Sequence, residues 1–156
     1  MLRHRLQRFS LEGRVTTNRG TVTAHRIVRA TEGFTHGIAG NEREWIPLNS
    51  AIVVTEPVPD AMWDELGWNG YELFGDASHA YCYAQRTQDN RIAMGGRGVP
   101  YRFGSKTDVN GETQAETVEK LKDILYRMLP QTRSLKLDHA WCGVLGVPRD
   151  WCTTAG

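Results

Sequence analysis

Residues 113–129 constrain the fold more than any other stretch, because their apolar side chains recur every three or four positions. That spacing places them on one face of an α-helix, which another element must cover. Thr113 and Glu116 form a capping-box pattern at the start, and Pro130 cannot continue the helix. We therefore predict a helix that ends near Leu129 and packs on a sheet. Its apolar face comprises Val118, Leu121, Ile124, Leu125, Met128 and Leu129.

The chain before this helix carries several strand signals. Residues 14–30 predict a hairpin whose turn contains Asn18, Arg19 and Gly20. Residues 51–55, AIVVT, form a β-branched run bounded by prolines and predict a buried strand. A short helix is expected next, with Asp60 as its cap and Gly67 as its stop.

Three further runs, YELFGD, AYCYAQRT and RIAMGG, predict an antiparallel meander, because turn residues such as Asp89 and Asn90 separate them. Residues 134–141 predict a last strand after the long helix. Strands followed by a helix and another strand indicate an α+β fold. We expect a mixed, largely antiparallel sheet covered by helices.

Composition limits the class of protein. A chain of 156 residues with 40% hydrophobic and 24% charged residues can form one domain with a real core. A formal charge of +1 provides no field that would attract nucleic acid or anionic lipid, so neither is expected as a partner. No apolar run has the length of a membrane helix, and we predict a cytoplasmic protein.

Metal and disulfide chemistry are not indicated. The cysteines at positions 82, 142 and 152 are widely spaced, without a CxxC pair, and the histidines are scattered. The sequence contains no GxSxG, P-loop or GxGxxG motif. Gly95-Gly96-Arg97-Gly98 could cradle a phosphate, but a tight turn after a strand is the favoured interpretation, since no helix follows directly.

Aromatic residues gather on the predicted meander. Alternation places Tyr81 and Tyr83 on one sheet face, with Arg86 close to the strand end. Such a face could line a pocket for a planar cofactor or an amine. Plain core packing is the other interpretation, and composition favours it.

Three stretches together resemble a known family. They are GTVTAHRIVRATEGFT from residue 20, YCYAQRTQDNRIAMGGR from residue 81, and the spacing of Trp141, Gly143, Asp150 and Gly156. These resemble FAD-dependent oxidoreductases of the D-amino-acid oxidase, glycine oxidase and γ-glutamylputrescine oxidase type. The resemblance implies an internal piece of a two-domain flavoenzyme. Residues 1–46 would border the FAD-binding domain, 47–140 would form the substrate-binding domain, and 141–156 would return toward the flavin.

The same resemblance implies a function and a site. It implies oxidation of a C–N bond in a small amine or amino acid by hydride transfer to FAD, with no metal and no assigned catalytic residue. Leu145 stands where relatives commonly have a carboxylate-binding arginine, which favours an amine substrate unless Arg97 or Arg102 replaces that charge. The substrate-binding candidates are Tyr83, Arg86, Arg97 and Tyr101, and the cofactor-binding candidates are Ala30, Thr31, Gly33, Trp141 and Gly143.

Two further expectations follow. Because no dinucleotide fingerprint lies within the sequence, the isolated chain is expected to be inactive and to retain no FAD. The alternative function is a stand-alone domain that binds a small molecule or another chain without catalysis. An exposed sheet face would in either case favour a homodimer.

Overall fold

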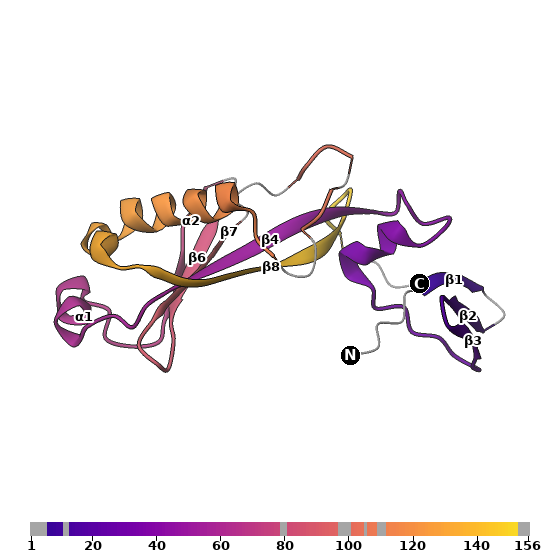
Figure 1. Cartoon of the computed structure of the whole chain (residues 1–156), viewed down its shortest axis with the longest axis horizontal. Coiled ribbons are helices and arrows are strands. Elements are labelled where there is room, and N and C mark those ends of the chain that lie inside the picture. The colour runs from indigo at the N-terminus through magenta and orange to yellow at the C-terminus, as the bar shows by residue number, and fades with distance from the viewer. Residues whose placement is uncertain are drawn as a thin grey trace. The chain divides into compact units, whose positions relative to one another are not determined.

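The computed structural model describes residues 6–10, 13–78, 81–96, 101–104, 106–108 and 112–152. It divides into two compact units: unit 1 contains Met1–Leu48 and Val144–Gly156, and unit 2 contains Asn49–Gly143. Figure 1 labels the elements along the chain. Their bounds are β1 (Leu6–Ser10), β2 (Arg14–Thr17), β3 (Gly20–Thr23), η1 (Glu32–Gly37), β4 (Trp45–Thr55), α1 (Asp60–Leu66), β5 (Leu73–Gly75), β6 (Cys82–Arg86), β7 (Ile92–Gly96), α2 (Ala115–Met128), η2 (Pro130–Ser134) and β8 (Leu137–Pro148).

The larger sheet has the strand order β5-β6-β7-β4-β8. Strand β7 is antiparallel to both of its neighbours, with Met94 opposite Ala84 on β6 and opposite Val53 on β4. These three side chains are fully buried. The predicted antiparallel meander is therefore confirmed as β5, β6 and β7, and the predicted AIVVT strand forms the second half of β4.

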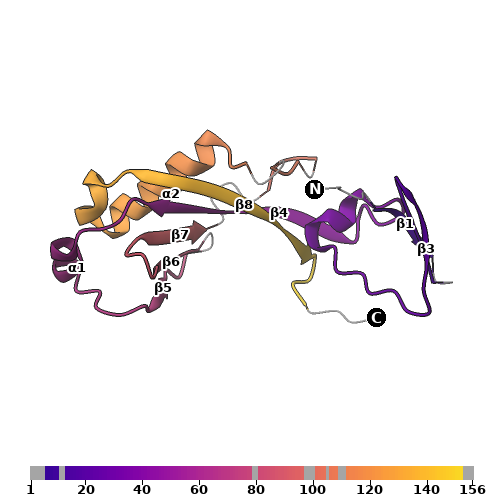
Figure 2. The ribbon, with the colours of Figure 1, turned by 60° about the horizontal axis from the view of Figure 1, so that its bottom comes forward.

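Helix α2 covers one face of this sheet (Figure 2). Leu121 and Leu125 are 0% exposed and belong to the same core cluster as Val53 and Met94. The helix lies close to the strands, because a Cβ atom on Gly96 would lie 3.3 Å from Leu121 Cδ2. The apolar face predicted for residues 113–129 is thus confirmed as the cover of the sheet.

The predicted capping box of α2 is wrong. Gln114, in an extended conformation, is the N-cap residue, and no side chain caps the helix. The helix consequently begins one residue later than the box requires, so Glu116 is not at the position that reaches back to the cap. Glu116 instead forms an i,i+4 ion pair with Lys120, at 2.9 Å.

The short helix α1 is confirmed, with a correction at its start. Asp60 is the first helical residue, and Pro59 before it is the N-cap residue. Proline fits there because its fixed φ suits the extended cap conformation and its missing N–H group needs no partner. At the other end Gly67 has a φ of 65°, a left-handed conformation that ends the helix as predicted.

Two strands are longer than predicted. β4 begins at Trp45 rather than at residue 51, and β8 continues to Pro148 rather than ending at residue 141. β8 contains Gly143 and Gly146 although glycine weakens strands. The pairing of β4 with β8 in the sheet overrides that local preference.

Unit 1 contains a small antiparallel sheet in the order β1-β2-β3. The predicted hairpin is confirmed, with Val15 opposite Val22, but its second strand ends at Thr23 rather than near residue 30. Strand β1 was not predicted; it pairs with β2 and places Phe9 opposite Val15. No helix in the described part of the chain is long and apolar enough to cross a bilayer.

The packing of α2 yields a first prediction. Replacing Leu125 with alanine should lower the free energy of unfolding of the chain by about 2–5 kcal/mol, because it leaves a cavity between the helix and the sheet. Asp123 is exposed on the same helix, so Asp123→Ala should change the free energy by less than about 0.5 kcal/mol. Urea denaturation measures both values. Equal losses would contradict this description of the core.

Candidate functional site

The sheet face away from α2 carries the aromatic side chains singled out by the sequence. Tyr83 and Gly95 face each other across β6 and β7. A Cβ atom on Gly95 would lie only 2.5 Å from the Tyr83 hydroxyl oxygen, so the tyrosine ring lies across the glycine backbone. The Tyr81 ring is next to it, with the centroids 6.5 Å apart. The predicted pairing of Tyr81 with Tyr83 on one face is therefore observed. The Tyr83 ring occupies the space that a side chain at position 95 would take.

Strand β8 presents two of the cofactor-binding candidates on the same face. Cys142 belongs to the core cluster under α2, so its neighbours Trp141 and Gly143 project to the other side, as Tyr83 does beside Cys82. Trp141 is 38% exposed, and its ring stacks on His139 with the centroids 5.6 Å apart. We call Tyr83, Gly95, Trp141 and Gly143 the open face.

The open face has the character of a surface for a flat ring. A Cβ atom on Gly143 would have no atom within 4 Å, so a planar group can approach the β8 backbone closely there. The exposed edge of Trp141 and the ring of Tyr83 supply apolar area with polar tips. A planar heterocycle with polar edges fits this chemistry.

The other cofactor-binding candidates lie in unit 1, at the start of η1. Ala30 is exposed, and the Thr31 hydroxyl is hydrogen-bonded to that of Thr35, at 2.7 Å. Gly33 is buried, and a Cβ atom there would lie 2.5 Å from Val144 Cγ1. Gly33 therefore makes a close backbone contact with β8 itself.

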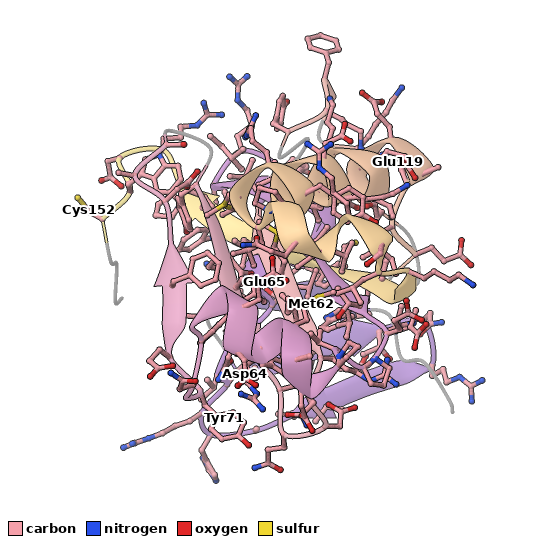
Figure 3. All side chains as sticks on the ribbon, turned by 90° about the vertical axis from the view of Figure 1, so that its left-hand side faces the viewer. Met62, Asp64, Glu65, Tyr71, Glu119 and Cys152 are labelled. Carbon is pink, nitrogen blue, oxygen red and sulfur yellow. The ribbon has the colours of Figure 1, made fainter. Side chains whose placement is uncertain are left out.

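Arg86, a substrate-binding candidate, points to the opposite sheet face from Tyr83. Its guanidinium donates hydrogen bonds to Asn90 Oδ1 at 2.7 Å and to the Trp68 carbonyl oxygen at 3.2 Å. It also lies 4.3 Å over the Trp63 ring. Figure 3 views the molecule from the side of α1, where Asp64, Glu65 and Tyr71 are labelled. The structure does not bring Arg86 together with the open face.

The remaining candidates follow β7. Tyr101 is 45% exposed, while Arg97 lies outside the described residues. Arg102 forms an ion pair with Asp108, whose side chain is 3% exposed. The Asp108 N–H group in turn donates to Asn49 Oδ1, at 2.9 Å. Sequence reasoning missed this arrangement, because no local pattern links residues 59 positions apart.

Comparison with known proteins decides the family. A family model described as "FAD dependent oxidoreductase" matches residues 2–153. The chain belongs to the FAD-dependent oxidoreductase family. FAD is the cofactor of this family, and the resemblance inferred from the sequence is confirmed.

Individual relatives are distant in sequence. "Probable oxidoreductase OrdL" of Haemophilus influenzae is 25% identical over 137 residues, which cover 83% of this chain and 28% of that protein. L-Proline dehydrogenase from P. horikoshii superposes with a TM-score of 0.65 at 19% identity, covering 94% of this chain and 38% of that one. Glycine oxidase from Geobacillus kaustophilus gives a TM-score of 0.64 at 16% identity, covering 95% and 36%. The chain thus spans well under half the length of these relatives.

The fold of this FAD-dependent oxidoreductase chain is consistent with that membership, since the solved relatives share its sheet and helix arrangement over almost its whole length. Among the described residues, no group of three or more His, Cys, Asp or Glu side chains is placed to hold a metal ion. The open face, with its bare backbone at Gly143, fits the flat ring system of a flavin.

Cys142 lies between the open face residues Trp141 and Gly143, but its thiol is poorly reactive. Its burial, and then the hydrogen-bonded carboxylate of Asp108, raise the pKa of the thiol to about 11. Burial and the charge of Asp76 likewise raise the pKa of the Cys82 thiol. Because the thiolate is the reactive form, both residues are protonated and poorly nucleophilic near neutral pH.

The cysteines of this FAD-dependent oxidoreductase chain should therefore differ in alkylation rate. Cys152 is exposed (Figure 3) and should react first with iodoacetamide at pH 7.5, whereas Cys142 and Cys82 should react only on unfolding or at much higher pH. Mass spectrometry of the labelled peptides over time measures the order. Fast labelling of Cys142 in the folded chain would show that its thiol is neither buried nor raised in pKa.

Proposed function

We propose that this chain is the substrate-side part of a flavoenzyme that oxidises a C–N bond of a small amine or amino acid. The observation that carries the proposal is the open face, where Tyr83 lies over Gly95 and Trp141 stands beside the bare backbone of Gly143. In a family that uses FAD, such a surface suits a flavin ring on one side and a small substrate against it. FAD, when bound, accepts the hydride from the carbon next to nitrogen.

The residues of this chain then position the reactants and exclude water. Trp141 and Gly143 form the surface against the flavin ring, and Tyr83 and Tyr101 contribute hydroxyl groups to the substrate pocket. Arg97 would bind the carboxylate of an amino-acid substrate. The α2 core keeps the strands that carry these groups in fixed register, which orientation-dependent chemistry requires.

The charges of the described residues favour an amine over a free amino acid. Leu145 offers no charge to a substrate carboxylate, and Arg102 is already neutralised by Asp108. Arg86 is held between Trp63 and Asn90 on the other sheet face. The solved relatives are named for proline, glycine and iminodiacetate, which all contain an amine nitrogen together with a carboxylate. We propose an amine or polyamine derivative for this protein.

Flavin absorption tests the proposed function. A full-length protein that contains this chain should be yellow after purification, and its flavin bands should bleach when an amine substrate is added without oxygen. The 156-residue chain alone should be colourless, because the phosphates of FAD need backbone N–H groups at a helix N-terminus that its sequence motifs do not provide. A colourless full-length protein would refute the flavoenzyme and leave a binding domain, which could dimerise through the open face.

Tyr83 tests the substrate side. Tyr83→Phe keeps the ring over Gly95 but removes the hydroxyl, so the fold should be unchanged while KM rises about 3- to 10-fold, the worth of one neutral hydrogen bond. Tyr71→Phe is the matched control, because Tyr71 lies beside Arg86 at a distance from the open face. Steady-state kinetics measures both variants. An unchanged KM in Tyr83→Phe would remove this hydroxyl from the pocket.

A further inference from the structure

Glu32 has an unusual backbone conformation for its side chain. It is the first residue of η1, and its φ of 44° lies in the left-handed region. This conformation destabilises a residue with a Cβ atom by about 1–2 kcal/mol, whereas glycine adopts it freely. Asn90, which shares this conformation in the turn before β7, is a residue type that tolerates it well. A strained glutamate requires a compensating interaction.

The compensation is a hydrogen bond to β8. Glu32 Oε2 accepts the N–H group of Gly146, at 2.8 Å. Among the described strands, β8 is at the edge of its sheet and pairs with β4 alone, so N–H groups on its outer side face no other described strand. A carboxylate is a stronger acceptor for such a group than a neutral oxygen is. The side chain of Glu32 therefore forms a hydrogen bond that joins η1 to β8, 114 positions later in the sequence.

Two glycines allow this bond to form. A Cβ atom on Gly33 would lie 2.8 Å from the Leu145 carbonyl oxygen, and one on Gly146 would lie 2.6 Å from the Glu32 carbonyl carbon. Neither position has room for a side chain, and the obstructing atoms belong to backbone that cannot move aside. The start of η1 and the end of β8 are thus in direct backbone contact, and the Glu32 carboxylate joins them.

We propose that Glu32 is a positioning residue that clasps η1 to the edge of β8 and so fixes the two segments for flavin binding. The role in flavin binding rests on the function proposed above. Ala30 and Thr31, two of the cofactor-binding candidates, immediately precede the clasp in the same unit. Without the carboxylate, the hydrogen bond that orders these two segments is lost, and the ordering has to accompany cofactor binding, which weakens it.

Three substitutions in the full-length flavoprotein separate the clasp from simple stability. Glu32→Ala removes the acceptor and keeps the strained backbone. Glu32→Gly removes the acceptor and the strain together. Glu32→Gln keeps an acceptor without its charge. Glu42→Ala is the matched control, because Glu42 Oε1 also accepts a backbone N–H group, that of Gly40, at 3.0 Å in the same unit.

Two measurements are made on each variant: the dissociation constant for FAD, by fluorescence titration of the apoprotein, and hydrogen exchange of the peptide containing Gly146. We expect Glu32→Ala and Glu32→Gly to bind FAD about tenfold more weakly, as the loss of a charged hydrogen bond predicts, and to exchange faster at Gly146. Glu32→Gln should bind FAD about threefold more weakly, because it keeps a neutral acceptor. The thermal midpoint of the Glu32→Gly apoprotein should equal or exceed that of Glu32→Ala, because the strain is gone. Glu42→Ala should bind FAD as the unmodified protein does.

A merely structural glutamate would give a different pattern, in which FAD affinity follows the thermal midpoint and Glu32→Gly recovers it. That recovery, or an equal loss in Glu42→Ala, would overturn the proposal, and so would unchanged exchange at Gly146 in Glu32→Ala. If the unmodified full-length protein bound no FAD, the proposed function would fail, and the flavin role of Glu32 with it. The exchange comparison would still show separately whether the clasp exists.

Discussion

The fold depends on the contact between one helix and one sheet. Leu121 and Leu125 of α2 pack in one core with Val53 and Met94 of the sheet, and all four side chains are 0% exposed. Burying this apolar area is the main favourable term available to a domain of this size. Because a strand alternates its side chains between two faces, committing one face to the helix decides what the other face presents.

The other face is therefore available for function, and its details come from glycine. Gly95 leaves room for the Tyr83 ring to lie against the backbone, and Gly143 leaves the β8 backbone bare next to Trp141. In unit 1, Gly33 and Gly146 permit a contact that no larger residue allows. At Gly95 the absent side chain makes room for an aromatic ring, and at Gly33 and Gly146 it makes room for a backbone contact.

Two arginines considered for the substrate are bound to other groups within the protein. Arg86 is bound by Asn90 and stacked over Trp63, and Arg102 is paired with the nearly buried Asp108. The sequence made Arg86 a substrate-binding candidate, and it made Arg97 or Arg102 the replacement for a carboxylate-binding arginine. The structure assigns Arg86 and Arg102 partners within the protein, which shifts the proposed substrate toward an amine.

The sequence by itself determined the elements whose signals are local: the apolar face of α2, the stop at Gly67, the meander of β5 to β7 and the family membership. Periodicity and turn chemistry act over a few residues, so they can be read without knowing the fold. Only the tertiary structure decided the length of β4 and β8, the contacts of Arg86 with Trp63 and Trp68, and the bonds from Asp108 to Asn49 and from Glu32 to Gly146. These join residues far apart in sequence, and their partners are chosen by strand register and backbone contact, which no local pattern encodes.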